Sequence, residues 1–239
     1  MPIHDQRFND ETGPHWYSAR PMYRNVPNLI TILRLLLTVI FFFILNINDV
    51  STFERQMWIG FVVFVVATLT DMLDGYLARK WKAESAFGRV VDPFVDKILI
   101  GGAFIFFSSN HFISVAARSK FSEFIAATPP PSLTGVVPWM VVVLIAREFL
   151  ITSIRGLAEA QGIDFRADWA GKVKMITQSV AASAVLVDLA LTGKVPWVHW
   201  TRDVAIWTTI VVTLLSATTY VIRARRIFKD LRVEGGGDD

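Results

Sequence analysis

The sequence contains no cysteine and comparatively little charge. The absence of cysteine excludes disulfide bonds and any metal site built from thiolates. Charged residues make up 19% of the 239 residues and hydrophobic residues 53%, whereas soluble globular domains usually carry about 25% charged residues. No glycine- or serine-rich linker and no repeat of solenoid length divides the chain. These absences favour one membrane-embedded domain over a soluble or multidomain protein.

The two ends of the sequence differ in composition from the middle. Residues 1–24 are polar and lack the apolar core of a cleavable signal peptide, so we expect a polar leader there. Residues 226–239 are first basic and then acidic, and we expect a disordered tail. The predicted membrane domain is therefore residues 25–225.

Six apolar segments approach the length of about 20 helical residues that a bilayer core requires. They occupy residues 28–46, 57–78, 93–113, 136–157, 175–191 and 203–222. The chain is thus predicted to be an all-α integral membrane protein with a six-transmembrane-helix bundle and both termini on one side. Arginine and lysine concentrate on that side, which the positive-inside rule assigns to the cytoplasm. With no transit segment before the first span, we expect a bacterial inner membrane.

Four aspartates lie at the cytoplasmic edge of the second and third predicted spans. Asp71 and Asp74 are three residues apart, and Asp92 and Asp96 are four apart, so each pair shares a helical face. The connecting loop is short enough to bring the two faces together. Four neighbouring carboxylates need compensating cations to stay ionised. Oxygen ligands without thiol or histidine select Mg²⁺, Mn²⁺ or Ca²⁺, and a pair of such ions is a known device of phosphoryl chemistry.

Small residues accompany these acids on the same two segments. Gly75, Ala78 and Gly88 leave room for a flat group to approach the backbone closely. Arg79 offers a donor for a phosphate. Taken singly, each acid also fits a solvated boundary charge, and each small residue also fits a helix-packing position. The shared register on two consecutive helices is what favours a binding site.

The acidic stretch resembles the signature of the CDP-alcohol phosphotransferases at every fixed position, Asp71-x2-Asp74-Gly75-x2-Ala78-Arg79-x8-Gly88-x3-Asp92-x3-Asp96. The resemblance implies a six-helix membrane enzyme, usually homodimeric, that transfers a phosphatidyl or related group from a CDP-activated donor to an alcohol and releases CMP. It also implies that Asp71, Asp74 and Asp92 hold two Mg²⁺ or Mn²⁺ ions, with Asp96 sharing one ion and acting as general base. The signature residues that would contact the CDP donor are Asp74, Gly75, Ala78, Arg79 and Gly88.

Two further regions are similar to the phosphatidylglycerophosphate synthases of that family: "NVPNLITILRLLL" (25–37), and "AREFLITSIRGLAEAQG" (146–162) with "AGKVKMITQ" (170–178). This similarity implies CDP-diacylglycerol as donor, glycerol 3-phosphate as acceptor and membrane lipids as surroundings. Asn28, Thr31 and Arg34 would then contact the donor. Asn28 and Thr31 also fit a helix cap, and Arg34 also fits a side chain that snorkels to the headgroups.

Basic residues near the cytoplasmic ends of the fourth and fifth predicted spans form a second candidate cluster. Arg147 and Arg155 are eight residues apart, near one helical face, and an intramembrane arginine is a functional candidate by default. With Lys172 and Lys174, they are predicted to bind the phosphate of the acceptor. The alternatives are an ion pair between Arg147 and Glu148, and anchoring of the lysines at the membrane surface.

Three other functions stay open on the sequence alone. A sibling enzyme would use inositol phosphate or phosphatidylglycerol as acceptor. A cation transporter would also place acids in the membrane, although at mid-bilayer and on several helices rather than at one edge. A structural scaffold leaves the spacing of the signature unexplained. No motif supports nucleic-acid binding.

Overall fold

The computed structural model describes residues 26–46, 49–81, 86–109, 133–161, 169–191 and 195–234. All regular elements in these ranges are helical, so the predicted all-α class is confirmed for the described part. A single 3₁₀ turn, η2 (Val50–Thr52), precedes the second of the long helices. The α-helices are α1 (Val26–Leu45), α2 (Phe53–Trp81), α3 (Ala86–Ser108), α6 (Pro138–Ala160), α7 (Trp169–Leu191) and α8 (Pro196–Glu234).

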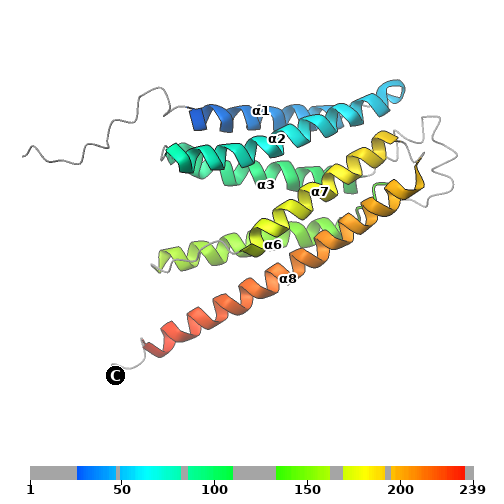
Figure 1. The fold of residues 1–239 in the computed structure, drawn as a ribbon. Coiled ribbons are helices and arrows are strands. Elements are labelled where there is room, and N and C mark those ends of the chain that lie inside the picture. Colours follow the sequence, from blue (N-terminus) through cyan, green and yellow to red (C-terminus); the bar gives the residue numbers. More distant parts are fainter. Residues whose placement is uncertain are drawn as a thin grey trace, which may run out of the picture.

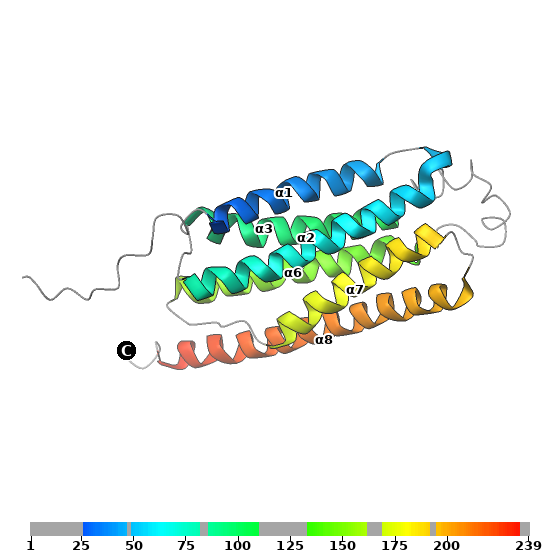
Figure 2. The ribbon, with the colours of Figure 1, turned by 45° about the horizontal axis from the view of Figure 1, so that its top comes forward.

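The helices run alternately in opposite directions along an elongated bundle (Figures 1 and 2). The start of α1, the end of α2, the start of α3 and the ends of α6 and α8 gather at one end, which we call the α2–α3 end. α1 packs against both α2 and α3, while α7 packs against α2, α3 and α8. The acidic signature, which spans the end of α2 and the start of α3, therefore lies at one end of the bundle.

By length and composition, three helical stretches within the described ranges could cross a membrane: Phe53–Asp71, Gly171–Leu191 and Pro196–Arg225. A shorter apolar stretch, Leu29–Leu45, forms most of α1. Large apolar side chains face outward on several helices, as expected of a surface in contact with lipid, among them Leu36, Phe43, Val62, Phe149 and Leu215. The chain is accordingly an integral membrane protein, and its six spans stay a prediction.

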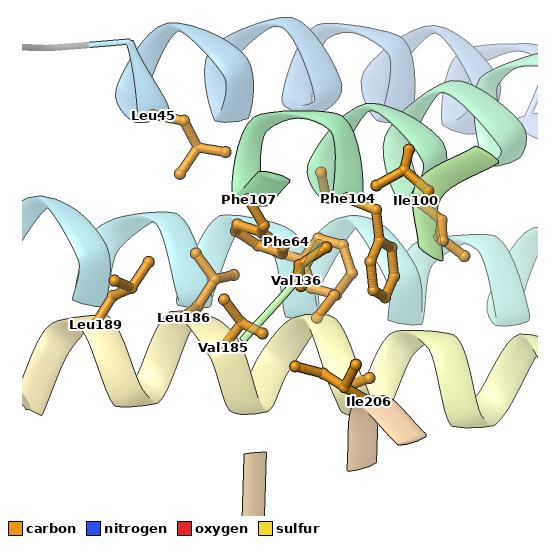
Figure 3. Packing of buried hydrophobic residues seen from close by; sticks show 14 of the residues in the cluster. Leu45, Phe64, Ile100, Phe104, Phe107, Val136, Val185, Leu186, Leu189 and Ile206 are labelled. Atoms are coloured by element: carbon orange, nitrogen blue, oxygen red, sulfur yellow. The ribbon is translucent and has the colours of Figure 1, made fainter. Parts of the chain in front are cut away.

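One buried apolar cluster joins the helices along the middle of the bundle. Phe64 of α2, Phe104 and Phe107 of α3 and Leu186 of α7 come together there (Figure 3). α7 also contributes small, fully buried residues such as Ala181. Small residues let helices approach closely, which is consistent with the central position of α7. This core holds the helices whose ends carry the predicted site.

The end of the bundle opposite the α2–α3 end contains a buried ionic cluster around Asp188 and Arg202. Arg202, at the start of α8, donates to Asp188 Oδ2 at 2.5 Å and to the carbonyl of Leu133 at 2.9 Å. Its Nε and Nη2 donate to Asp203 Oδ1 at 2.9 and 2.8 Å. His199 Nδ1 lies 2.8 Å from Asp188 Oδ1. The cluster links α7, α8 and the segment before α6. It also gives a structural role to Asp188, which matches no sequence motif.

The last helix is longer than the sequence predicts. α8 continues to Glu234, through most of the predicted disordered tail 226–239 and well past the predicted span 203–222. Residues 223–234 contain no glycine or proline and several good helix formers, so nothing in the chain stops the helix there. The predicted leader 1–24 and residues 235–239 lie outside the described residues.

We expect Asp188→Asn to lower the free energy of unfolding by about 3 kcal/mol, the lower end of the range for a broken buried ion pair, because Asp203 still faces Arg202. Denaturation of the purified protein in detergent micelles measures the loss. Asp203→Asn is the matched control, since it removes another carboxylate from the same arginine. Its side chain is 50% exposed, so we expect less than about 1 kcal/mol. Equal losses in the two variants would contradict a dominant role for the buried pair.

Candidate active site

The structure describes the side chains of two of the four predicted metal ligands, Asp71 on α2 and Asp96 on α3. The rest of the signature lies on the helical backbone of α2 and α3 with side chains outside the described set: Asp74, Gly75, Ala78, Arg79, Gly88 and Asp92. Among the described side chains, no group of three or more His, Cys, Asp or Glu residues could hold a metal ion. The four-carboxylate site therefore stays a prediction.

Arg34 of α1 pairs with one of the two described acids. It is fully buried on α1 and forms an ion pair with Asp71, whose side chain is 20% exposed. α1 packs against both α2 and α3, so this pair ties α1 to the helix that carries the first half of the signature. Its complete burial excludes the alternative that Arg34 snorkels to the headgroups.

A cavity of about 600 Å³ lies between α3, α6 and α7. Its polar lining comes from Asp96, Lys97, Glu148, Thr152, Lys174 and Gln178. Apolar residues of α3 and α6, among them Phe104 and Leu144, line the remainder. Lys97 Nζ donates to Thr152 Oγ1 at 2.7 Å and so joins the two walls. An apolar cavity with a few convergent polar groups is the usual form of a small-molecule site, and this one suits an amphiphile.

Two of the four predicted acceptor cations meet at one carboxylate. Arg147 Nη1 and Lys174 Nζ lie 2.9 and 2.6 Å from the same oxygen, Oε1 of Glu148. Arg147 is held from the other side by α8, where Nη2 donates to Ser216 Oγ at 2.6 Å and the guanidinium lies 5.8 Å from the ring centroid of Tyr220. The alternative in which Arg147 pairs with Glu148 is thus confirmed, and Lys174 shares the pair.

The other predicted contacts are placed differently. Lys172 is exposed, as its alternative role of surface anchor requires, and Arg155 is half-buried. Nε of Arg155 has no hydrogen-bond partner among the described residues. Thr31 is buried on α1, one helical turn before Arg34, whereas the side chain of Asn28 lies outside the described set.

Sequence reasoning did not find several residues that shape the site. Ser216 lies on α8, 69 residues from Arg147, in a segment for which the sequence predicts only an apolar membrane span. Thr152 and Gln178 are likewise single polar residues in apolar segments. Glu148 was visible as a neighbour of Arg147, but its second partner, Lys174, depends on how α7 packs against the rest of the bundle.

Comparison with known proteins agrees with the resemblance drawn from the acidic signature. Among curated relatives, a CDP-diacylglycerol–glycerol-3-phosphate 3-phosphatidyltransferase of Bacillus subtilis is 30% identical over 205 residues, covering 82% of this chain and 93% of the relative. A probable phosphatidylglycerophosphate synthase of Mycobacterium tuberculosis is 30% identical over 223 residues, covering 93% and 91%.

A third relative, the CDP-diacylglycerol–glycerol-3-phosphate 3-phosphatidyltransferase of Salmonella typhimurium, is 27% identical over 206 residues, which cover 85% of this chain and 97% of the relative. The family model for CDP-alcohol phosphatidyltransferase matches residues 24–218, which include all six described α-helices in whole or in part. The resemblance noted in the sequence is confirmed, and the chain belongs to the CDP-alcohol phosphatidyltransferase family.

Proposed function

We propose that this protein transfers the phosphatidyl group of CDP-diacylglycerol to glycerol 3-phosphate, giving phosphatidylglycerophosphate and CMP. The observation that carries the proposal is that Asp96 and Lys174 line one cavity, so that a proton acceptor and a phosphate-binding cation face the same space. The names of relatives that cover most of this chain support the same donor and acceptor.

In the proposed reaction, the bond from the acceptor hydroxyl oxygen to the lipid-side phosphorus forms as the bond from that phosphorus to the CMP oxygen breaks. The hydroxyl is a poor nucleophile until its proton leaves, and a carboxylate within hydrogen-bond reach can take the proton. Asp96 is the described carboxylate on α3 that faces the cavity. Lys174, with Arg147 behind it, would hold the acceptor's phosphate, which orients the hydroxyl toward Asp96.

The donor is an amphiphile, and the cavity suits one. Most of its apolar lining on α3 and α6, such as Phe104 and Leu144, lies farther from the α2–α3 end than Asp96 and Glu148 do, although Phe94 and Phe149 accompany the polar residues. A lipid phosphate at Asp96 would therefore leave the diacylglycerol in apolar surroundings and the nucleotide at the polar end. This division matches a reaction that joins a membrane-bound donor to a water-soluble acceptor.

Divalent ions fit the residues at the α2–α3 end. Asp71 and Asp96 supply hard carboxylate oxygens, the ligands that Mg²⁺ and Mn²⁺ prefer, and Asp71 already pairs with a cation, Arg34. We propose that Asp71, Asp74, Asp92 and Asp96 hold two such ions. When bound, the ions would offset negative charge on the pyrophosphate of the donor.

We further propose six transmembrane helices, both termini and the site on the cytoplasmic side of a bacterial inner membrane, and a homodimer. The arrangement of the helices supports the orientation. The ends of α2 and α8 share the α2–α3 end (Figure 1), and both are basic, with Arg79 and Lys80 on α2 and Arg223 and Arg225 on α8. Such residues concentrate on the cytoplasmic side of membrane proteins.

Release of CMP by the purified protein tests the proposed function. With CDP-diacylglycerol in detergent micelles, we expect CMP to appear only when glycerol 3-phosphate is added, because the alcohol is the nucleophile. Inositol phosphate and phosphatidylglycerol serve as alternative acceptors in parallel reactions. Faster release with either of them would assign the protein to a sibling activity, and cation flux into liposomes without any nucleotide would favour a transporter.

Replacement of Asp96 tests the general base. Asp96→Asn keeps the size of the side chain but cannot take a proton, so we expect kcat to fall about 100-fold or more, with CDP-diacylglycerol binding largely retained. Asp203→Asn, which makes the same change at the opposite end of the bundle, should leave kcat unchanged. Asp96 loses the proposed role if the variant keeps more than about a tenth of the wild-type rate.

Removal of divalent ions tests the metal assignment. We expect EDTA to abolish CMP release, because the proposed ions offset the charge of the pyrophosphate, and Mg²⁺ or Mn²⁺ in excess to restore it. EDTA saturated beforehand with Mg²⁺ is the control for effects of the chelator itself. Full activity in free EDTA would contradict the assignment of divalent ions to the four aspartates.

A further inference from the structure

Glu148 joins two buried cations at the wall of the cavity. A single carboxylate oxygen, Oε1, lies within hydrogen-bond distance of two cations from different helices, Arg147 of α6 and Lys174 of α7. Both cations are less than 10% exposed, whereas the side chain of Glu148 is 22% exposed. Glu148 and Lys174 line the cavity that also contains Asp96. The oxygen where the two cations converge is therefore at the wall of the proposed site.

The contacts of the two cations match those that a phosphate would make. Phosphate oxygens accept hydrogen bonds from arginine and lysine just as carboxylates do, and they carry more charge. Arg147 is fixed independently of Glu148 by Ser216 and Tyr220 of α8. An oxygen placed between Arg147 and Lys174 would thus find the arginine in position whether it belongs to Glu148 or to a ligand.

The side chain of Glu148 has room to leave this position. Its backbone is held, because its carbonyl accepts a hydrogen bond from Thr152 Oγ1 at 2.8 Å, but the residue lines the cavity and its side chain is 22% exposed. Lys97, on the facing wall, donates to Thr152, one helical turn from Glu148. A displaced carboxylate would therefore have another cation close to it, and would not be left alone in an apolar region.

We propose that Glu148 is an internal substitute for the acceptor's phosphate: its carboxylate neutralises Arg147 and Lys174 in the empty site and is displaced when the phosphate binds. This inference rests on the proposed function, in which those cations bind glycerol 3-phosphate. The exchange weakens acceptor binding, since the phosphate must compete with a group already in place. It also favours release of the product, which carries the same phosphate, when Glu148 returns.

The test compares Glu148→Gln with the wild-type protein. Glutamine keeps the size of the side chain and one acceptor oxygen, but it loses the charge and replaces the other oxygen with an NH2 donor. We expect KM for glycerol 3-phosphate and the inhibition constant of inorganic phosphate to fall about tenfold, or about 1.4 kcal/mol in affinity, with KM for CDP-diacylglycerol unchanged. We also expect kcat to fall, because the product is held more tightly.

Glu148→Asp is the matched second variant. It keeps the charge but is one methylene shorter, so the carboxylate can no longer reach both cations, and phosphate should inhibit it more strongly than it inhibits the wild type. If Glu148→Gln does not fold, this variant decides the question. A higher KM for glycerol 3-phosphate, or an unchanged one, in the decisive variant would overturn the proposal and assign Glu148 the role of orienting the two cations.

The rise in thermal stability that inorganic phosphate causes provides a measurement that does not depend on turnover. At equal phosphate concentration, we expect a larger rise in Tm for Glu148→Gln than for the wild type, and a smaller or equal rise counts against the exchange. If the wild type releases no CMP with glycerol 3-phosphate, the proposed function fails while this comparison still tests Glu148. If the wild type turns over and only the variant results disagree, the inference about Glu148 alone is wrong.

Discussion

The structure depends on ion pairs that neutralise charged side chains inside an apolar helical bundle. Burying an ionised group is costly unless an opposite charge and hydrogen bonds compensate it. Three sites in the described part of the chain meet this requirement, each with charges on different helices: Arg34 with Asp71, Glu148 with Arg147 and Lys174, and Arg202 with Asp188. Each pairing fixes helices relative to one another, so the same contacts that make the charges tolerable also set the geometry of the bundle.

Two of these three ionic sites belong to the proposed active site, and the third does not. Arg34 joins α1 to α2, and Glu148 joins α6 to α7 with Arg147 reaching α8. Asp96 on α3 lines the same cavity as Glu148 and Lys174. The proposed chemistry therefore takes place where ion pairs join α1 to α2 and α6 to α7. The Asp188–Arg202 cluster lies at the other end of the bundle, away from the proposed site, and its role there is to stabilise the fold.

Much of the fold could be predicted from the sequence, because apolar segments and the spacing of motif residues are local features of the chain. All six predicted apolar segments overlap described helices, and Asp71 and Asp96 lie on the two helices, α2 and α3, that the signature joins in sequence. The partners of the buried charges could not be predicted from the sequence, because these contacts join residues that are far apart along the chain. No sequence motif around Asp188 predicts Arg202 as its partner, and none around Arg147 predicts Ser216, which is 69 residues away. The extent of α8 was missed because a charged run without glycine or proline can be helix or tail, and its composition alone favoured the tail.

The length of α8 has a consequence for the shape of the protein at the membrane surface. With 39 residues, it measures about 58 Å at 1.5 Å per residue, roughly twice the 30 Å of a bilayer's hydrocarbon layer. A helix of that length cannot be hidden in lipid at any ordinary tilt. The part of α8 that exceeds the hydrocarbon layer includes its last residues, 223–234, whose sequence holds five basic and two acidic residues, so this end of the helix suits the level of anionic headgroups.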